Sequence, residues 1–322
     1  MTRPSLTLRV TRFAAEAKDV ALLELQSLDG KMLPPFEPGA HVEVHLDNGN
    51  IRHYSLLNDP AEKNRYVIAV SLAQKSLGGS HYIHTAVRQG DLLQIGSPRN
   101  NFPLKKDSQR YYFIAGGIGI TPILSMIRWC IANGKTWRLV YTARNRQRAA
   151  FYETLLEFDE KNLFFHFNDE QADQFIDIHS LVDGIREDEQ VYCCGPNPLM
   201  QAVKHATEGV LSNRIHFEWF SAPAESTTPS EAALERFSVT IKSTGHTFEV
   251  APDQTILEAL ETQGIDTPFS CRAGICATCE TKVCHGVPDH RDYVLSEEDR
   301  ASGKSMMICV SRSLSQSLTL DL

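Results

Sequence analysis

Apolar and polar positions alternate in short runs along the first hundred residues. The runs SLTLRVTRF, HVEVHL and YVIAVSL are rich in β-branched residues, and Gly, Pro, Asn and Asp separate them. One short helix is expected in HYIHTAV, just after GGS. Short strands at this regular spacing predict a barrel or a sandwich.

The middle third changes to strands that alternate with helices. YYFIAGG predicts a strand, and TPILSMIRWCIANG predicts a helix with Thr121 as its N-cap, Pro122 in its first turn and Gly134 at its end. WRLVYTA and LFFHFND predict further strands, with AAFYETLLEF as a helix between them, and QVYCCGP predicts a strand leading into the helix PLMQAVKHAT. This alternation is typical of βαβ units around a parallel sheet.

The segment SAPAESTTPSEAALER, residues 221–236, has few bulky apolar side chains and is interpreted as a linker. After it, RFSVTIKSTGHTFEV resumes a strand pattern and TILEALETQG predicts a helix. The predicted boundaries are 1–104 for a β-barrel, 105–224 for an α/β domain, 225–235 for the linker and 236–322 for the last domain.

Composition narrows the class of protein. The chain has 322 residues, suited to more than one domain, and its formal net charge of −8 argues against nucleic acid as the main partner. No apolar run approaches the ~18 residues of a membrane span, and the N-terminus has no apolar core of an export signal. We therefore expect a cytoplasmic protein whose eight cysteines bind metal or are buried rather than form disulfides.

Four cysteines have the spacing of an iron–sulfur site. Cys271-x4-Cys276-x2-Cys279, with Cys309 about thirty residues on, is the plant-type [2Fe–2S] arrangement. Small residues between the first three let loop amides approach the cluster sulfides. The alternative is a structural zinc site with four Cys ligands, although zinc sites usually have paired C-x2-C motifs. Cys284 lies outside the spacing and is expected to be a small buried residue.

Two stretches of the first third can hold a flavin. Arg52 and Tyr54 share one face of a strand, where a guanidinium suits a phosphate and a tyrosine ring can stack on an isoalloxazine. The strand ends in Ser55, whose hydroxyl can bond the flavin. Downstream, GGS opens a helix, whose exposed amides make an anion site.

A nucleotide site is predicted where AGGIGITP joins a strand to a helix. Gly117-x-Gly119-x-x-Pro122 has the context that a dinucleotide fingerprint requires. The later VYCCGP ends another strand with glycine and is expected beside it.

Together these motifs resemble the phthalate dioxygenase reductase family, over essentially the whole chain. The resemblance implies a multidomain fold: an antiparallel β-barrel flavin domain, an α/β parallel-sheet nucleotide domain and an α+β plant-type ferredoxin (β-grasp) domain. It implies FMN, NADH and a [2Fe–2S] cluster as cofactors. It places Ser55, Thr121, Cys194 and Phe220 at the reacting centre, with the acidic Glu218 nearby. The implied cofactor-binding residues are Arg52, His53, Tyr54, Ser55, Lys75, Gly78, Gly79, Ser80, Gly117, Gly119, Thr121, Pro122, Arg144, Cys194, Gly195 and Phe220. Within this set, the side chain of His53 is expected on the opposite strand face.

The resemblance also implies the function. Electrons pass from the nicotinamide through the flavin to the cluster, and then one at a time to a partner protein, a terminal Rieske-type oxygenase of aromatic catabolism. Arg144, Arg146 and Arg148 follow a strand where NADP-binding sites carry arginine, so NADPH stays open beside NADH. The last domain has 8 Lys and Arg against 12 Asp and Glu, and an acidic surface steers it toward a basic partner. The alternatives are a general flavin and iron–sulfur reductase with another acceptor, a flavin diaphorase with a zinc module, and a redox sensor.

Overall fold

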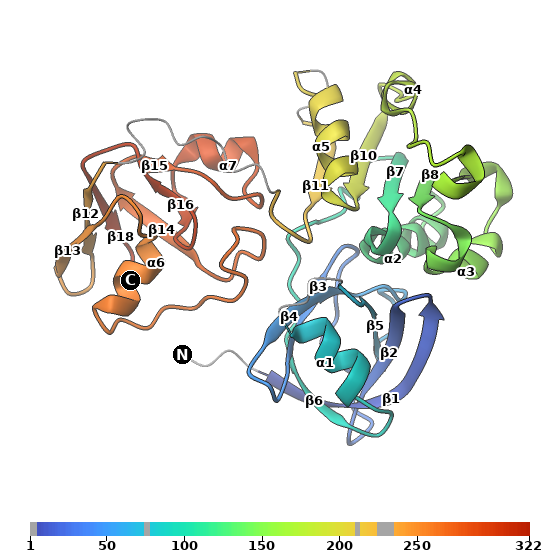
Figure 1. The fold of residues 1–322 in the computed structure, drawn as a ribbon, viewed down its shortest axis with the longest axis horizontal. Coiled ribbons are helices and arrows are strands. Elements are labelled where there is room, and N and C mark those ends of the chain that lie inside the picture. The colour runs from blue at the N-terminus through green and yellow to red at the C-terminus, as the bar shows by residue number, and fades with distance from the viewer. Residues whose placement is uncertain (1–4, 74–77, 210–212, 224–234) are drawn as a thin grey trace. The chain divides into compact units, whose positions relative to one another are not determined.

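The structure is a computed structural model that describes residues 5–73, 78–209, 213–223 and 235–322 (Figure 1). The chain divides into two compact units, Met1–Phe220 and Ser221–Leu322, and each is described by itself. Among the described residues, none of the helices combines the length and the apolar character that crossing a bilayer needs.

The first part of unit 1 is a six-stranded antiparallel sheet in the order β4-β3-β6-β1-β2-β5. The sheet curls until its edge strands β4 and β5 touch, so it forms a barrel around a leucine- and valine-rich core (Figure 1). The strands are β1 (Ser5–Ala17), β2 (Val20–Ser27), β3 (His41–His45), β4 (Ile51–Ser55), β5 (Tyr66–Ser71) and β6 (Leu92–Gly96), with one helix, α1 (Gly79–Ala86).

The second part of unit 1 is a five-stranded parallel sheet in the order β11-β10-β7-β8-β9. The first strand in the chain, β7, is central, and the chain order reverses between β7 and β10. The strands are β7 (Arg110–Gly116), β8 (Thr136–Ala143), β9 (Leu163–Phe167), β10 (Glu189–Cys194) and β11 (Ile215–Glu218). The helices are α2 (Ile120–Ala132), α3 (Tyr152–Leu156), α4 (Ile178–Asp183) and α5 (Asn197–Ala206), with short 3₁₀ turns η1 (Gly117–Gly119), η2 (Arg146–Arg148), η3 (Glu160–Asn162) and η4 (Asn168–Gln171).

One apolar core joins the barrel to the parallel sheet. Leu22, Leu57 and Val67 of the barrel pack with residues of β7 and α2. Polar contacts fix the same junction, since the Ser125 hydroxyl accepts the Gly39 amide at 3.1 Å and Arg128 donates to the Leu57 carbonyl. The middle of α2 is therefore held against the segments just before β3 and just after β4.

Unit 2 is a second, separate core around a five-stranded sheet in the order β13-β12-β18-β14-β16, in which β12 and β18 are parallel. Its strands are β12 (Phe237–Ile241), β13 (Thr247–Val250), β14 (Glu280–His285), β16 (Ser305–Met307) and β18 (Ser317–Leu320), with a small pair of β15 (Pro288–Asp289) and β17 (Arg312–Ser313). Its helices are α6 (Ile256–Thr262), which begins with a capping box of Thr255 and Glu258, and α7 (Glu297–Ser302).

The structure refines three of the predicted elements. The helix α2 begins at Ile120, and Thr121 lies inside its first turn, donating to the Ile118 carbonyl at 2.9 Å, so Thr121 is not the N-cap. The helix predicted over 149–158 is only α3, because Phe151 has a left-handed φ of 61° just before it. The strand pattern after the linker is a hairpin of β12 and β13, with Gly245 at the positive φ of its turn.

Candidate functional site

Arg52, near the beginning of β4, and the glycines at the beginning of α1 form a cradle that a phosphate would fit. Gly78 has φ 94°, which a residue with a side chain rarely adopts, and it is the N-cap of α1. A Cβ on Gly79 would stand 2.6 Å from Cγ and Nε of Arg52, so the arginine side chain lies directly over the glycine backbone. A guanidinium beside the start of a helix fits an anion such as the phosphate of a flavin.

The other side chains of this motif divide between the two faces of β4. Tyr54 packs against the barrel core, and burial raises its pKa to about 12. Ser55 is buried at the end of the strand, and the Ser80 hydroxyl accepts the Ala73 amide at 3.2 Å. His53 lies on the opposite face, with Nδ1 3.4 Å from Nη2 of Arg99. Lys75 lies outside the described residues.

The glycine motif lies at the reversal point of the parallel sheet. Gly117 has φ 51° in η1, and a Cβ on Gly119 would stand 2.3 Å from the Cys194 carbonyl oxygen. A Cβ on Gly195 would stand 3.0 Å from Cα of Gly116. The loops that follow β7 and β10 therefore touch backbone to backbone, which only glycine allows. In open α/β sheets, ligands bind in the crevice at this reversal point.

Thr121 and Pro122 are buried in the first turn of α2, beside this crevice. Ser125 donates to the Pro122 carbonyl at 2.9 Å and accepts the Gly39 amide, and Gly39 leads into β3, whose His41 pairs with Ser55 at the end of β4. The fold thus gathers two of the predicted central residues, Ser55 and Thr121, at one junction of barrel and sheet.

Cys194 and Glu218 are partners in the register of β10 and β11. Burial, with the nearby Glu218 carboxylate, raises the pKa of the Cys194 thiol well above its usual value. Glu218 is partly exposed as a residue, yet its Oε2 is buried and has no hydrogen-bond partner within the described part of the chain. Burial raises the pKa of Glu218 to about 8, so the carboxyl is largely protonated at neutral pH. Phe220, two residues on, is 40 % exposed.

The three arginines after β8 differ in what they contact. Arg146 forms an ion pair with Glu170 and donates from Nη1 to the Tyr152 hydroxyl at 2.6 Å. Arg148 pairs with Asp19 of the barrel at 2.7 Å. Arg144 directly follows β8, and its carbonyl accepts the Asp169 amide.

The predicted cluster ligands converge in unit 2. Cys276, Cys279 and Cys309 are buried and Cys271 is half-buried, and all four are free thiols. The four thiols lie close enough to interact, and this proximity lowers the pKa of Cys271 and Cys279 and raises that of Cys276 and Cys309. Cys309 lies in the turn after β16 rather than on a strand.

The loop of the first three cysteines is shaped for a cluster rather than for a regular element. Arg272, Gly274 and Ala277 have φ of 52°, 68° and 55°, and these left-handed residues turn the loop inward. The Ala273 amide donates to Sγ of Cys271 at 3.4 Å, as amides do to cluster-ligating sulfur. No three His, Cys, Asp or Glu side chains among the described residues surround one point as the ligands of a single metal ion would. Three thiols on such a loop, together with Cys309 from the turn after β16, fit a binuclear cluster.

Cys284 contradicts one expectation. It is exposed on β14 rather than buried. The reason is the alternation along β14, in which Cys284 shares the exposed face of the strand with Glu280 and Lys282.

Comparisons with known proteins identify two domains of the chain and its family. The family model described as the 2Fe-2S iron-sulfur cluster binding domain matches residues 239–314, and that described as the oxidoreductase NAD-binding domain matches residues 113–205. The phthalate dioxygenase reductase of Burkholderia cepacia is 38% identical over 332 residues and covers all of both chains. The chain belongs to the phthalate dioxygenase reductase family.

Further relatives support this membership. The tetrachlorobenzoquinone reductase of Sphingobium chlorophenolicum is 43% identical over 328 residues, again over the whole of both chains. A solved phthalate dioxygenase reductase, described as a modular structure for electron transfer from pyridine nucleotides to [2Fe-2S], matches with a TM-score of 0.71 and 37% identity over 99% of this chain and 98% of that one. As a family member, the chain is an oxidoreductase with FMN, NADH and a [2Fe–2S] cluster as its cofactors.

Sequence reasoning missed three features of these sites. The burial of the Glu218 Oε2 atom without a hydrogen-bond partner in the described chain results from the pairing of β10 with β11. The partner of Arg146, Glu170, comes from a turn 24 residues away. Asp292, behind the cluster loop, stood in DHRDYVLSEED without a recognised role. The available signal was an aspartate in an irregular segment, because such a side chain can accept the backbone amides two and three positions on.

Proposed function

We propose that this chain is the reductase component of an oxygenase system and delivers electrons singly to a terminal Rieske-type oxygenase. One observation carries the proposal: a single chain holds three distinct donor sets. These are the cradle of Arg52 and Gly79, the glycine-lined crevice at Gly119, and the four thiols that include Cys309. A protein that only hydrolysed or bound a nucleotide would have no use for the other two.

Within the barrel, the proposed flavin site divides its tasks. Arg52, with Gly78, Gly79 and Ser80, binds the phosphate of the flavin. Tyr54 lies along the ring and Ser55 donates to its polar edge. Lys75 is a further phosphate ligand in this proposal, and His53 supports β4 from the other face through Arg99.

In the parallel sheet, Gly117, Gly119 and Gly195 let the NADH backbone approach the sheet closely. Thr121 and Pro122 close the crevice toward the flavin. Cys194 and Phe220 line the end of the crevice that receives the nicotinamide. Because Glu218 is protonated, this end of the crevice holds no buried anion. Arg144 is assigned to the adenosine end.

When bound, the flavin and the cluster would supply the redox chemistry that links a two-electron hydride donor to a one-electron acceptor. The chain binds, orients and shields the centres. The buried contact between α2 and the segment after β4 keeps water away from the Ser55 side chain. We assign residues 1–104 to the FMN barrel, 105–224 to the nucleotide domain, 225–235 to the linker and 236–322 to the ferredoxin domain.

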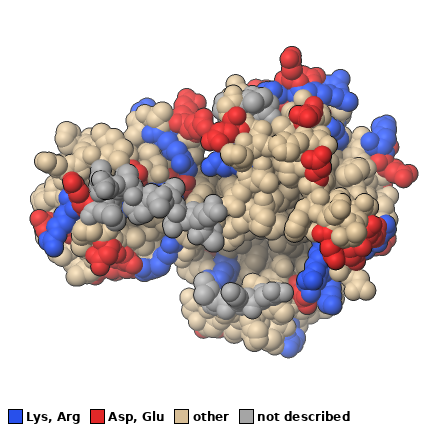
Figure 2. Space-filling view, turned by 45° about the horizontal axis from the view of Figure 1, so that its top comes forward, with Lys and Arg blue, Asp and Glu red and all other residues tan. Residues whose placement is uncertain are grey.

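The proposed partner is recognised by charge. The ferredoxin domain has 8 Lys and Arg against 12 Asp and Glu. On the face that Figure 2 shows, acidic and basic side chains are interspersed rather than gathered into one basic area. An acidic electron donor steers toward a basic patch on its acceptor, and salt screens that attraction.

The test is electron delivery to a purified Rieske-type oxygenase of aromatic-acid catabolism. NADH and the reductase should reduce the oxygenase and support product formation, with a rate that falls as salt is raised. A rate that is flat across the salt series would contradict the steering by charge. Failure to reduce any Rieske-type oxygenase would contradict the proposed function.

A second acceptor class has a specific basis, since one relative that covers the whole chain is a tetrachlorobenzoquinone reductase. The same assay with a halogenated quinone separates the two. Faster turnover with the quinone than with any oxygenase would assign the chain to quinone reduction instead.

A further inference from the structure

A buried carboxylate lies directly behind the cluster loop. The side chain of Asp292 is completely buried in unit 2. A Cβ on Gly274, inside the loop of Cys271 to Cys279, would stand 3.0 Å from Cα of Asp292 and 2.7 Å from Cγ2 of Val310. The glycine is thus clamped between Asp292 and the residue that follows Cys309.

The segment around Asp292 is bonded to both ligand-bearing segments. The Tyr293 amide donates to the Gly274 carbonyl at 2.9 Å, which ties it to the loop of three cysteines. The Arg291 amide donates to the Ser311 hydroxyl at 3.2 Å, which ties it to the turn of Cys309. Residues 291–293 therefore tie the two parts of the ligand set together.

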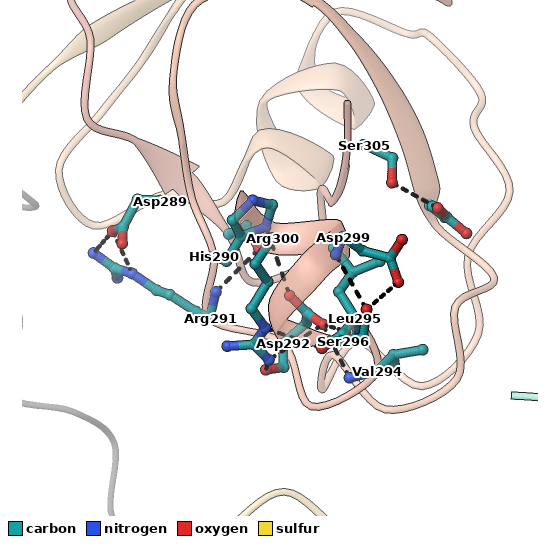
Figure 3. A network of polar contacts seen from close by, with 12 residues as sticks. Asp289, His290, Arg291, Asp292, Val294, Leu295, Ser296, Asp299, Arg300 and Ser305 are labelled. Atoms are coloured by element: carbon teal, nitrogen blue, oxygen red, sulfur yellow. Dashed lines mark hydrogen bonds and ion pairs between the residues drawn. The ribbon is translucent and has the colours of Figure 1, made fainter. Parts of the chain in front are cut away.

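The charge of Asp292 is held in place by few partners (Figure 3). Its Oδ1 accepts the amides of Val294 and Leu295 at 2.9 and 2.8 Å. Nη2 of Arg300 lies 3.6 Å from Oδ1 and donates to the Asp292 carbonyl, while Nε donates to the Leu295 carbonyl at 3.1 Å.

The second oxygen is the unusual one. Oδ2 of Asp292 is buried and has no hydrogen-bond partner within the described residues. The nearest ionisable neighbour is Nδ1 of His290, at 3.9 Å, beyond hydrogen-bond distance. Both ring nitrogens of His290 are also buried without partners in the described chain, and burial lowers the pKa of His290, which keeps the ring neutral. Arg300 is thus the cation that balances the carboxylate.

We propose that Asp292 and Arg300 are positioning residues that hold the cluster loop against the turn of Cys309 and, as a fixed pair of opposite charges, set the reduction potential of the [2Fe–2S] cluster. A buried anion beside the cluster opposes the arrival of an electron, and the arginine offsets it. The pair keeps the cluster able both to accept an electron from the flavin and to release it.

The test compares Asp292→Asn and Arg300→Gln in the full chain with its cofactors. The cluster potential is measured by anaerobic titration with redox dyes, followed by the EPR signal of the reduced cluster. Asp292→Asn removes the anion and should raise the potential. Arg300→Gln leaves the anion unbalanced and should lower it. Each change should alter the ratio of reduced to oxidised cluster at a fixed solution potential by threefold or more, which is about 28 mV for one electron.

Asp289→Asn is the matched control. It removes a carboxylate from the same segment, but one that is partly exposed and paired with Arg291 at 2.8 Å. Its potential should stay near that of the parent chain.

Potential shifts of opposite sign in the two variants indicate electrostatic tuning. If the two residues only supported the loop, both variants would shift the potential in the same direction. Shifts of the same sign, or shifts no larger than that of the control, would overturn the proposal. If Asp292→Asn assembles little cluster, the potential of the fraction that does assemble and the direction of the potential shift in Arg300→Gln still test the proposal. The outcome is independent of the partner protein, since no acceptor is present.

Discussion

Arg146 and Glu170 form a two-pronged ion pair between the turns that follow β8 and β9. The same guanidinium donates to the Tyr152 hydroxyl and lies over the rings of Tyr152 and Phe167. An arginine at this end of the sheet is the residue type that binds the 2′-phosphate of NADPH. Here its charge is already balanced, which favours NADH.

Glu170→Gln should therefore increase the use of NADPH. Without the Glu170 carboxylate, Arg146 can make a charge-assisted contact of ~1.5 kcal/mol with a 2′-phosphate. We expect kcat/KM for NADPH to rise about tenfold while that for NADH changes little, measured by steady-state reduction of a dye acceptor. Glu187→Gln, at an exposed site before β10, is the control and should change neither. An unchanged ratio in Glu170→Gln would show that Arg146 has no part in nucleotide choice.

Cys309→Ser should abolish the [2Fe–2S] cluster while Cys284→Ser keeps it. Cys309 is buried among the other thiols, whereas Cys284 is exposed on β14. Iron and sulfide content and the EPR spectrum of the reduced protein report the difference. A full complement of iron in Cys309→Ser would show that another residue is the fourth ligand.

Gly119→Ala should impair nucleotide binding without unfolding the chain. Gly119 has an ordinary helical φ of −62°, so alanine strains no dihedral, but its Cβ would stand 2.3 Å from the Cys194 carbonyl oxygen. Separating the two loops by about 1 Å should slow flavin reduction by NADH on the order of 10²-fold in rapid mixing.

Gly134→Ala is the matched control for that variant. Gly134 has φ 61° and no atom within 4 Å of an added Cβ, so it should lose about 1 kcal/mol of stability and keep its rate with NADH. Equal rates in the two variants would mean that the contact of Gly119 with Cys194 does not shape the crevice.

Glu218 should make the stability of unit 1 fall with rising pH. Burial raises the pKa of this carboxyl from 4.5 to about 8, so the folded state binds the proton more tightly than the unfolded state. Its contribution is fully favourable below pH ~4.5 and is lost as pH rises to about 8, at up to ~1.4 kcal/mol per pH unit. Glu218→Gln should lack this slope.

Calorimetry of both chains across this pH range checks the sign. The variant should become the more stable of the two toward pH 8. An exposed control, Glu208→Gln, should follow the parent chain. A parent chain with no slope beyond that of Glu218→Gln would show that the carboxyl is solvated.

The sequence predicted the elements whose cause is local. Alternation along β3, the apolar β-branched run of β5, the glycine between β7 and α2, and the spacing Cys271-x4-Cys276 are each legible in a few neighbouring residues. The predicted start of α2 is two residues late because η1 runs directly into the helix, so Gly119 rather than a capping side chain precedes it.

What the sequence could not give depends on pairing between distant segments. The contact of Gly119 with Cys194 exists only because β10 lies beside β7, and the burial of Glu218 only because β11 lies beside β10. The ion pair of Arg146 with Glu170 likewise requires β9 beside β8. Charge patterns alone left those arginines open to NADPH.

The central claim is that one chain passes electrons from NADH through a flavin to its own [2Fe–2S] cluster. Anaerobic rapid mixing of the purified chain with NADH, followed by the flavin and cluster absorbance bands and by freeze-quench EPR, tests it most directly. The account predicts flavin reduction first, then the EPR signal of a reduced [2Fe–2S] cluster, with NADPH much slower. A flavin that is reduced while no such signal forms, or a protein that contains zinc in place of iron, would contradict it.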